Sequence, residues 1–214
     1  FRVLLAAVLC VALARAAAAP AEALTTFFCR FDGSPSADLS VGSPHPEGVV
    51  ALAAGRQGRA LLARNGILPY EETVSPFFSG IHYDVEGNLN LAEGTLEAWV
   101  KPLFDARTSP ETAPKLRYLL SSARYVGELH AFALLLVRGD KPDKPYSLVW
   151  TRQNGAKRIW SASAPAPWEA GSWHHVAATY SAKEDVLYAD GKAVARFAAG
   201  EPMDFVADTF AVGS

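Results

Sequence analysis

Residues 94–102 read Gly-Thr-Leu-Glu-Ala-Trp-Val-Lys-Pro, in which Leu96, Ala98 and Val100 alternate with Glu97 and Lys101. Such alternation predicts a β-strand, because successive side chains of a strand point to opposite faces of the sheet. On both sides of this stretch the chain continues as short apolar or alternating runs separated by Gly, Pro, Asn and Asp, with hardly any helical periodicity. The pattern predicts an all-β fold, an antiparallel β-sandwich.

The strands expected from this pattern are short and spread over the chain. They cover Thr26–Asp32, Gly58–Leu62, Gly94–Lys101, Arg117–Ser122, Ala131–Arg138, Tyr146–Arg152, Lys157–Ala162, Trp173–Ser181, Asp185–Ala189, Ala193–Ala198 and Phe210–Ser214.

The composition fits one globular domain. The chain has 214 residues, half of them hydrophobic, with 20 basic and 22 acidic side chains, which is long enough to bury a full core. Disordered and disulfide-stapled classes are excluded. A net charge of −2 gives no electrostatic reason to expect nucleic acid as a partner, since that would need a clustered positive surface.

The first 23 residues have the features of a signal peptide. Arg2 precedes an apolar run, and the small-residue pattern of Ala21 to Ala23 predicts cleavage before Leu24. The apolar run is shorter than the about 20 residues of a membrane span, so no span is expected. A buried N-terminal helix is the alternative interpretation. We expect residues 24–214 to form the domain and the protein to be exported to the periplasm, the cell surface or the medium, with a bacterial source indicated.

Cleavage would remove Cys10 and leave Cys29 as the single cysteine. Cys29 lies in the apolar stretch Phe27–Phe31, which favours a buried thiol over a reactive one.

Two dipeptides predict tight hairpin turns. Asn154-Gly155 and Asp190-Gly191 are typical of two-residue type I′ loops. If Asn154-Gly155 is a two-residue loop, the strands on either side of it pair Trp150 with Ile159 and Val149 with Trp160. One face would then carry the core residues Tyr146, Leu148, Trp150 and Ile159, and the other would carry Ser147, Val149, Thr151, Arg158 and Trp160.

Two segments resemble laminin-G-like jelly-roll domains of the concanavalin A-like lectin/glucanase superfamily. They are Gly94–Pro102, with its Trp-Val-Lys-Pro ending, and Trp-His-His-Val-Ala at 173–177 followed by Leu-Tyr-Ala-Asp-Gly at 187–191. The resemblance spans about residue 26 to the C-terminus and implies a jelly-roll sandwich. Family members continue with a closing strand, so the resemblance implies that the sequence stops before it.

The resemblance also implies a structural calcium ion beside the opening strand. Asp32 is the matching position and Asp38 follows on the next loop; carboxylate oxygens are ligands that Ca²⁺ prefers. Asp32 is equally suited to forming a turn before Gly33.

Catalysis is not expected. The jelly-roll glucanases carry their catalytic carboxylates on one strand, in the pattern Glu-x-Asp-x-x-Glu. A retaining mechanism needs two carboxylates about 5–5.5 Å apart. Glu97 is the only acidic residue of its strand. His174 and His175 are adjacent on a strand, so they point to opposite faces and cannot chelate one ion.

Carbohydrate is the expected ligand, and the expected contact residues are Trp160, Arg158, Thr151 and Tyr125. Sugar C–H faces stack on aromatic rings while polar neighbours bind the hydroxyls. A core position for Trp160 is the alternative, and Trp99 and Trp173 are expected to pack. The sequence therefore predicts a secreted, non-catalytic glycan-binding or adhesion module. The alternatives are a protein-interaction or structural module of a larger extracellular protein and an accessory domain of a glycoside hydrolase.

Overall fold

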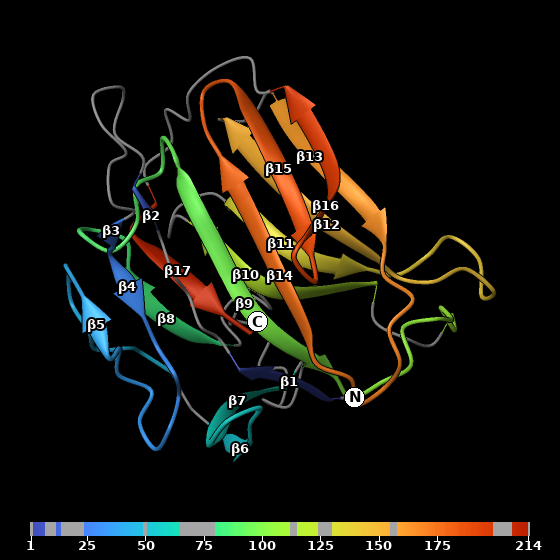
Figure 1. Ribbon diagram of the computed structural model, residues 1–214, viewed down its shortest axis with the longest axis horizontal. Helices are drawn as coiled ribbons and strands as arrows, with labels where there is room; N and C mark the ends of the chain where they lie inside the picture. The colour runs from blue at the N-terminus through green and yellow to red at the C-terminus, as the bar shows by residue number, and fades with distance from the viewer. Residues whose placement is uncertain are drawn as a thin grey trace, which may run out of the picture.

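The computed structural model describes residues 2–6, 12–13, 24–48, 51–64, 80–111, 115–123, 130–154, 158–198 and 207–213. Within these ranges the chain forms strands and turns, arranged as two facing antiparallel sheets with the larger sheet in front in Figure 1. No helix long and apolar enough to cross a membrane occurs in the described ranges. The prediction of an all-β antiparallel sandwich is confirmed.

The larger sheet has seven strands. Its order is β16 (Lys192–Ala198), β15 (Glu184–Ala189), β14 (His174–Tyr180), β9 (Gly94–Pro102), β1 (Arg2–Ala6), β7 (Arg59–Arg64) and β6 (Leu52–Ala54).

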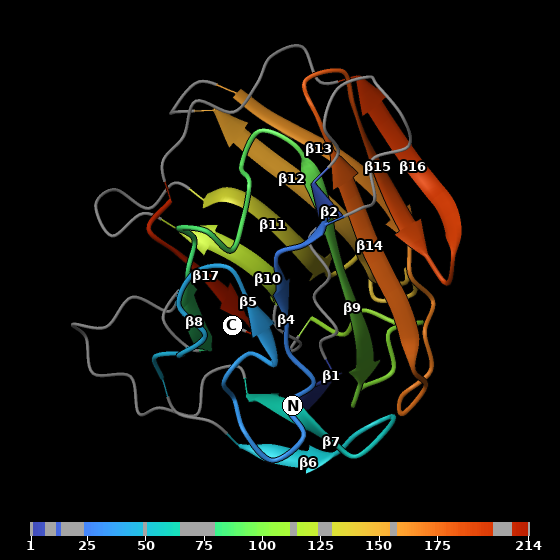
Figure 2. The same ribbon diagram turned by 60° about the vertical axis from the view of Figure 1, so that its left-hand side comes forward.

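The smaller sheet has six strands. Its order is β13 (Arg158–Pro165), β12 (Ser147–Asn154), β11 (His130–Val137), β10 (Leu116–Ala123), β17 (Thr209–Val212) and β8 (Ile81–Asp84). Two further pairs, β2 (Ala12–Leu13) with β3 (Leu24–Thr25) and β4 (Phe27–Phe28) with β5 (Leu39–Ser40), lie beside the sandwich (Figure 2).

The core lies between the two sheets and follows the alternation seen in the sequence. On β9, Leu96, Ala98 and Val100 are buried, while Glu97 and Trp99 between them are half-buried on the opposite face. On β12, Leu148 and Trp150 are buried in the same way. The inner faces therefore pack apolar side chains together and the outer faces carry the mixed positions.

Most of the expected strands are present, with shifted ends, but the first one is wrong. Thr26–Asp32 was expected as one strand, whereas β4 ends at Phe28 and Phe31 has a φ of 58°. A left-handed residue interrupts a strand, so the chain turns here. β8 was missed, although the buried Ile81 and Tyr83 alternate with less buried neighbours.

The two predicted hairpins had different outcomes. Asp190 and Gly191 have φ angles of 50° and 76°, and Ala189 pairs with Lys192, which confirms the two-residue loop. The register predicted from Asn154-Gly155 is wrong, because Asn154 pairs with Arg158 and three residues separate them. A longer loop shifts every pair of the ladder, so Trp150 lies opposite Ala162.

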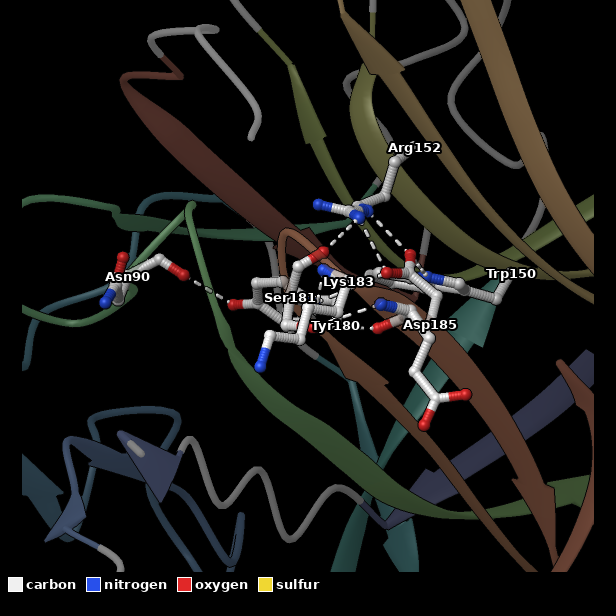
Figure 3. Close-up of polar contacts among 8 residues, drawn as sticks. Asn90, Trp150, Arg152, Tyr180, Ser181, Lys183 and Asp185 are labelled. Carbon is white, nitrogen blue, oxygen red and sulfur yellow. Dashed lines mark hydrogen bonds and ion pairs between the residues drawn. The ribbon is translucent and has the colours of Figure 1, made fainter. Parts of the chain in front are cut away.

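A buried ion pair joins the two sheets across the core (Figure 3). Arg152 of β12 donates from Nε to Oδ2 of Asp185 on β15 at 2.6 Å, and from Nη2 to Oδ1 at 2.6 Å. The indole Nε1 of Trp150 donates to the same carboxylate at 2.7 Å, and Arg152 also binds the carbonyl of Ser181. Both charged side chains are almost fully buried. The bidentate geometry and the added hydrogen bonds offset part of their desolvation, and burial still raises the pKa of Asp185.

Candidate functional site

The outer face of the seven-stranded sheet carries a group of aromatic and charged side chains. We call Arg56, Glu97, Trp99, Lys101, Trp173 and His175 the outer-face cluster. Trp99 lies opposite His175 in the β9–β14 ladder, with 5.2 Å between the ring centroids. Trp173 directly precedes β14, so it lies beside Lys101 of β9. Neighbouring strands of one sheet thus hold both indoles on one surface.

Both indoles are half-buried, and each has a cation over its ring. The guanidinium of Arg56, in the turn between β6 and β7, lies 3.8 Å from the centroid of Trp99. The ammonium of Lys101 lies 4.9 Å from the centroid of Trp173. These cation–π contacts hold the long side chains against the rings and add hydrogen-bond donors around an aromatic platform.

The base of the cluster is a small apolar group on the same face. Ala60 of β7 is fully buried there, and Ala53, Leu62, Trp99 and Trp173 pack around it. The prediction that Trp99 and Trp173 pack is therefore correct in part, because each indole packs along one side while remaining half-buried on the outer surface. Trp99 shares its face with Glu97 and Lys101, and that polar alternation was the sequence signal for an outer position.

The two adjacent histidines point to opposite sides, as expected, and each meets a carboxylate. Nε2 of His175 lies 3.3 Å from Oε2 of Glu97 within the cluster. Nδ1 of His174 lies 2.9 Å from Oδ2 of Asp190, whose other oxygen accepts a hydrogen bond from the backbone N–H of His175. His174 also stacks on Trp168, with ring planes 9° apart. His174 thus connects the turn at Asp190 to the start of β14, which is a structural role.

Of the four residues expected to contact a glycan, only Thr151 has a side chain within the described part of the chain. Tyr125 lies outside the described residues. The position of Trp160 pairs with that of Arg152 and the position of Arg158 with that of Asn154, while Thr151 pairs with Ser161. Paired positions share a face and adjacent positions alternate between faces. The position of Trp160 therefore lies on the face of Arg152, and not on the face of Thr151 as predicted. The side chains of Trp160 and Arg158 lie outside the described residues.

Asp32 and Asp38, the two residues expected at a calcium site, have different surroundings. Both oxygens of Asp38 accept hydrogen bonds from Arg30, from its Nη2 at 2.6 Å, its Nε at 3.0 Å and its backbone N–H at 2.8 Å. The hydrogen bonds from Arg30 lower the pKa of Asp38. Asp32 is exposed, and its carboxylate lies against Gly58, whose φ is 58°. The described residues hold no group of three or more His, Cys, Asp or Glu suited to a metal ion.

Cys29 is buried, as predicted. Tyr83 lies beside it, with its hydroxyl 3.7 Å from Sγ, and burial raises the pKa of the thiol to about 11. The thiol is therefore protonated at neutral pH and inert.

One open cleft lies at the rim of the sandwich where β8 ends. It has a volume of about 880 Å³, and its lining combines the carboxylates of Asp84, Glu86 and Asp208 with the apolar side chains of Leu89 and Leu91. None of the described residues that line it is aromatic. The cleft therefore differs in chemistry from the outer-face cluster.

Comparisons with known proteins found similarity at the level of family and fold. Residues 80–214 match a laminin G family model described as the concanavalin A-like lectin/glucanases superfamily. Domains LG4-5 of the mouse laminin alpha1 chain are 20% identical, with a TM-score of 0.42, over 62% of this chain and 29% of that one. Domain 4 of a GH43 extracellular arabinanase from Geobacillus stearothermophilus, solved with arabinotriose, is 20% identical, with a TM-score of 0.48, over 86% of this chain and 80% of that one. The search of curated proteins found no match.

Proposed function

Because the chain belongs to the laminin G branch of the concanavalin A-like lectin/glucanase superfamily, we propose that it is a secreted, non-catalytic carbohydrate-binding module and that the outer-face cluster is its binding surface. The observation that carries the proposal is the pair of half-buried indoles, Trp99 and Trp173, held side by side by β9 and β14. Sugar rings stack on such surfaces through their C–H faces.

The charged members of the cluster supply the polar contacts that orient a sugar. Lys101 and Arg56 donate, and Glu97 accepts, all within the same surface. Lys101 has a flexible four-carbon stem, so it can leave the face of Trp173 and bind a hydroxyl while a sugar ring takes its place. Each ring is thereby both a packing element and a platform.

The same residues support a binding role rather than hydrolysis. Glu97 is the acidic residue of the cluster, and its carboxylate lies 3.3 Å from the imidazole of His175. A retaining or inverting glycosidase needs two carboxylates that face each other across the scissile bond. The signal-peptide features of residues 1–23 support export.

A protein-interaction role has one observation in its favour. Leu24, Leu39 and Val41 are exposed apolar side chains. Leu24 lies in β3 and Leu39 in β5, and Val41 follows β5, where its N–H donates to the carbonyl of Thr26. A small exposed apolar surface of this kind suits a protein contact. None of these three residues belongs to the outer-face cluster, so the two roles are separable by mutation.

The test is a glycan array of neutral and charged oligosaccharides, followed by calorimetry with the glycans that bind. We expect Trp99→Ala and Trp173→Ala to weaken binding at least about tenfold, the loss typical of a central aromatic contact. Trp99→Phe keeps an aromatic ring and should retain most of the affinity. It is the control for a loss of affinity in Trp99→Ala that comes from misfolding.

Two control variants test whether the glycan binds at the outer-face cluster or elsewhere. Tyr118→Ala removes a half-buried aromatic residue of β10, which belongs to the six-stranded sheet and not to the sheet that carries the cluster. Asp208→Asn alters the rim cleft. Both should leave affinity unchanged. Binding that is lost in Asp208→Asn and retained in both tryptophan variants would move the site to the cleft, and an array without any bound glycan would overturn the proposal.

A further inference from the structure

The outer face of the seven-stranded sheet carries a further aromatic side chain, Tyr188 of β15. It stands between Leu187 and Ala189, which pack into the core, so its ring lies on the opposite face. Tyr188 pairs with Ala177 of β14, and Ala177 pairs with Glu97 of the outer-face cluster. Because paired positions share a face, Tyr188 lies on the face that carries the cluster. Figure 1 shows β9, β14 and β15 side by side in this sheet.

The residues paired with Tyr188 on both neighbouring strands are small. They are Ala177 on β14 and Ala193 on β16. β16 also has one extra residue, Val194, between the partners of Leu187 and Tyr188, and such a β-bulge bends the strand that carries it. The ring of Tyr188 is half-buried, and within the described part of the chain no second ring or cation lies against it and no group binds its hydroxyl. Its ring and its hydroxyl are therefore both open to a ligand.

The three aromatic side chains are spread along the face in successive steps. Trp99 pairs with His175 of β14, and Trp173 lies two positions before His175. Tyr188 pairs with Ala177, which lies two positions after His175. The positions of Trp173 and Ala177 are thus about 14 Å apart along the strand, at about 3.4 Å per residue. A single sugar ring is too short to reach from Trp173 to Tyr188, whereas an oligosaccharide is long enough.

We propose that Tyr188 forms a further subsite beside the outer-face cluster, and that the ligand is an oligosaccharide of three or more units bound along its length. This inference rests on the proposed function, since it places additional sugar units on the same surface. The two indoles hold the first units, the ring of Tyr188 stacks on the C–H face of the last one, and its hydroxyl binds a sugar hydroxyl. Chain length is then what the surface selects.

The test is calorimetry with the glycan selected on the array, supplied in forms of two to six sugar units. In the native chain the affinity should rise with length and then level off once all three rings are covered. Tyr188→Ala should lower the affinity for the longest form at least about tenfold and leave that for the two-unit form unchanged. The unchanged affinity for the two-unit form also shows that the variant is folded.

Two further variants serve as controls. Tyr188→Phe keeps the ring and should retain most of the rise in affinity with length. Tyr118→Ala removes an aromatic residue of the six-stranded sheet and should retain all of it.

The outcomes separate the subsite from the proposed function. If binding is lost in Trp99→Ala but the affinity does not rise with length, or rises equally in Tyr188→Ala and the native chain, the subsite is refuted and the proposed function stands. If the two-unit form still binds with native affinity in both Trp99→Ala and Trp173→Ala, the proposed function is refuted and the subsite with it.

Discussion

Arg152 and Asp185 form a bidentate ion pair across the sandwich, with both N–O distances at 2.6 Å and both side chains almost fully buried. They come from opposite sheets, so the pair fixes β12 against β15. Removing one partner would leave the other as a buried charge without a counter-ion. The pair is thus a strong constraint on how the sheets face each other.

Asp185→Asn should lower the free energy of unfolding by about 3–5 kcal/mol, the cost of leaving one buried charge unpaired. The double variant Arg152→Met, Asp185→Leu should recover most of that loss, because it leaves no charge behind. Urea denaturation measures both. The control is Arg196→Ala, which removes an exposed pair with Glu184 and should cost no more than about 1 kcal/mol. A double variant no more stable than Asp185→Asn would contradict this interpretation.

Cys29 should resist alkylation in the folded protein. Burial raises the pKa of its thiol to about 11, so the thiolate needed for the reaction is scarce and shielded at pH 8. The experiment uses a Cys10→Ser chain, so that one thiol remains, and follows iodoacetamide labelling by mass spectrometry. Labelling should be slow in buffer and fast in urea, and equal rates in the two conditions would show that the thiol is accessible.

Asp105 should titrate unusually low. The side chain of Arg107 donates hydrogen bonds to its carboxylate at 2.7 and 2.9 Å, and these bonds lower its pKa from 3.8 to about 2. Because the folded pKa is depressed, the contact favours folding above the ordinary pKa and that contribution is lost as the pH falls towards 2. An NMR titration should find the low pKa in the native chain and a value near 3.8 in Arg107→Ala. Arg196→Ala should leave it unchanged, and an ordinary pKa in the native chain would refute the assignment.

Calcium should have little effect on stability. Both oxygens of Asp38 accept hydrogen bonds from Arg30, so a calcium ion would have to displace Arg30 to bind this carboxylate. Thermal unfolding of the full chain should be the same in EDTA and in saturating calcium chloride. A rise in Tm with calcium that disappears in Asp38→Asn would restore the metal site expected from the resemblance.

The strands that could be predicted are those whose own residues carry the pattern. Leu96, Ala98 and Val100 alternate within one strand, and Asp190-Gly191 specifies its own turn, so local sequence was sufficient for both. The turn at Asn154-Gly155 failed because its loop has one more residue than the dipeptide suggested, and a ladder depends on the whole loop.

The outer-face cluster depends on contacts that no local pattern reveals. Arg56 reaches Trp99 from a turn some forty residues away in the chain, and Trp173 meets Lys101 only because β14 pairs with β9. The alternation on β9 indicated that Trp99 shares a face with Glu97 and Lys101. The gathering of a second indole and the two cations on that face could be recognised only when the neighbouring strands were in place.

The central claim is that Trp99 and Trp173 contact a sugar, and the indole N–H signals of the tryptophans test it most directly. The sequence has five tryptophans, and Trp150 is an internal control because its buried indole donates to Asp185. When a glycan selected on the array is titrated into the ¹⁵N-labelled protein, the signals of Trp99 and Trp173 should shift in a saturable way while that of Trp150 stays in place. A bound glycan that leaves both outer indoles unshifted would contradict the account.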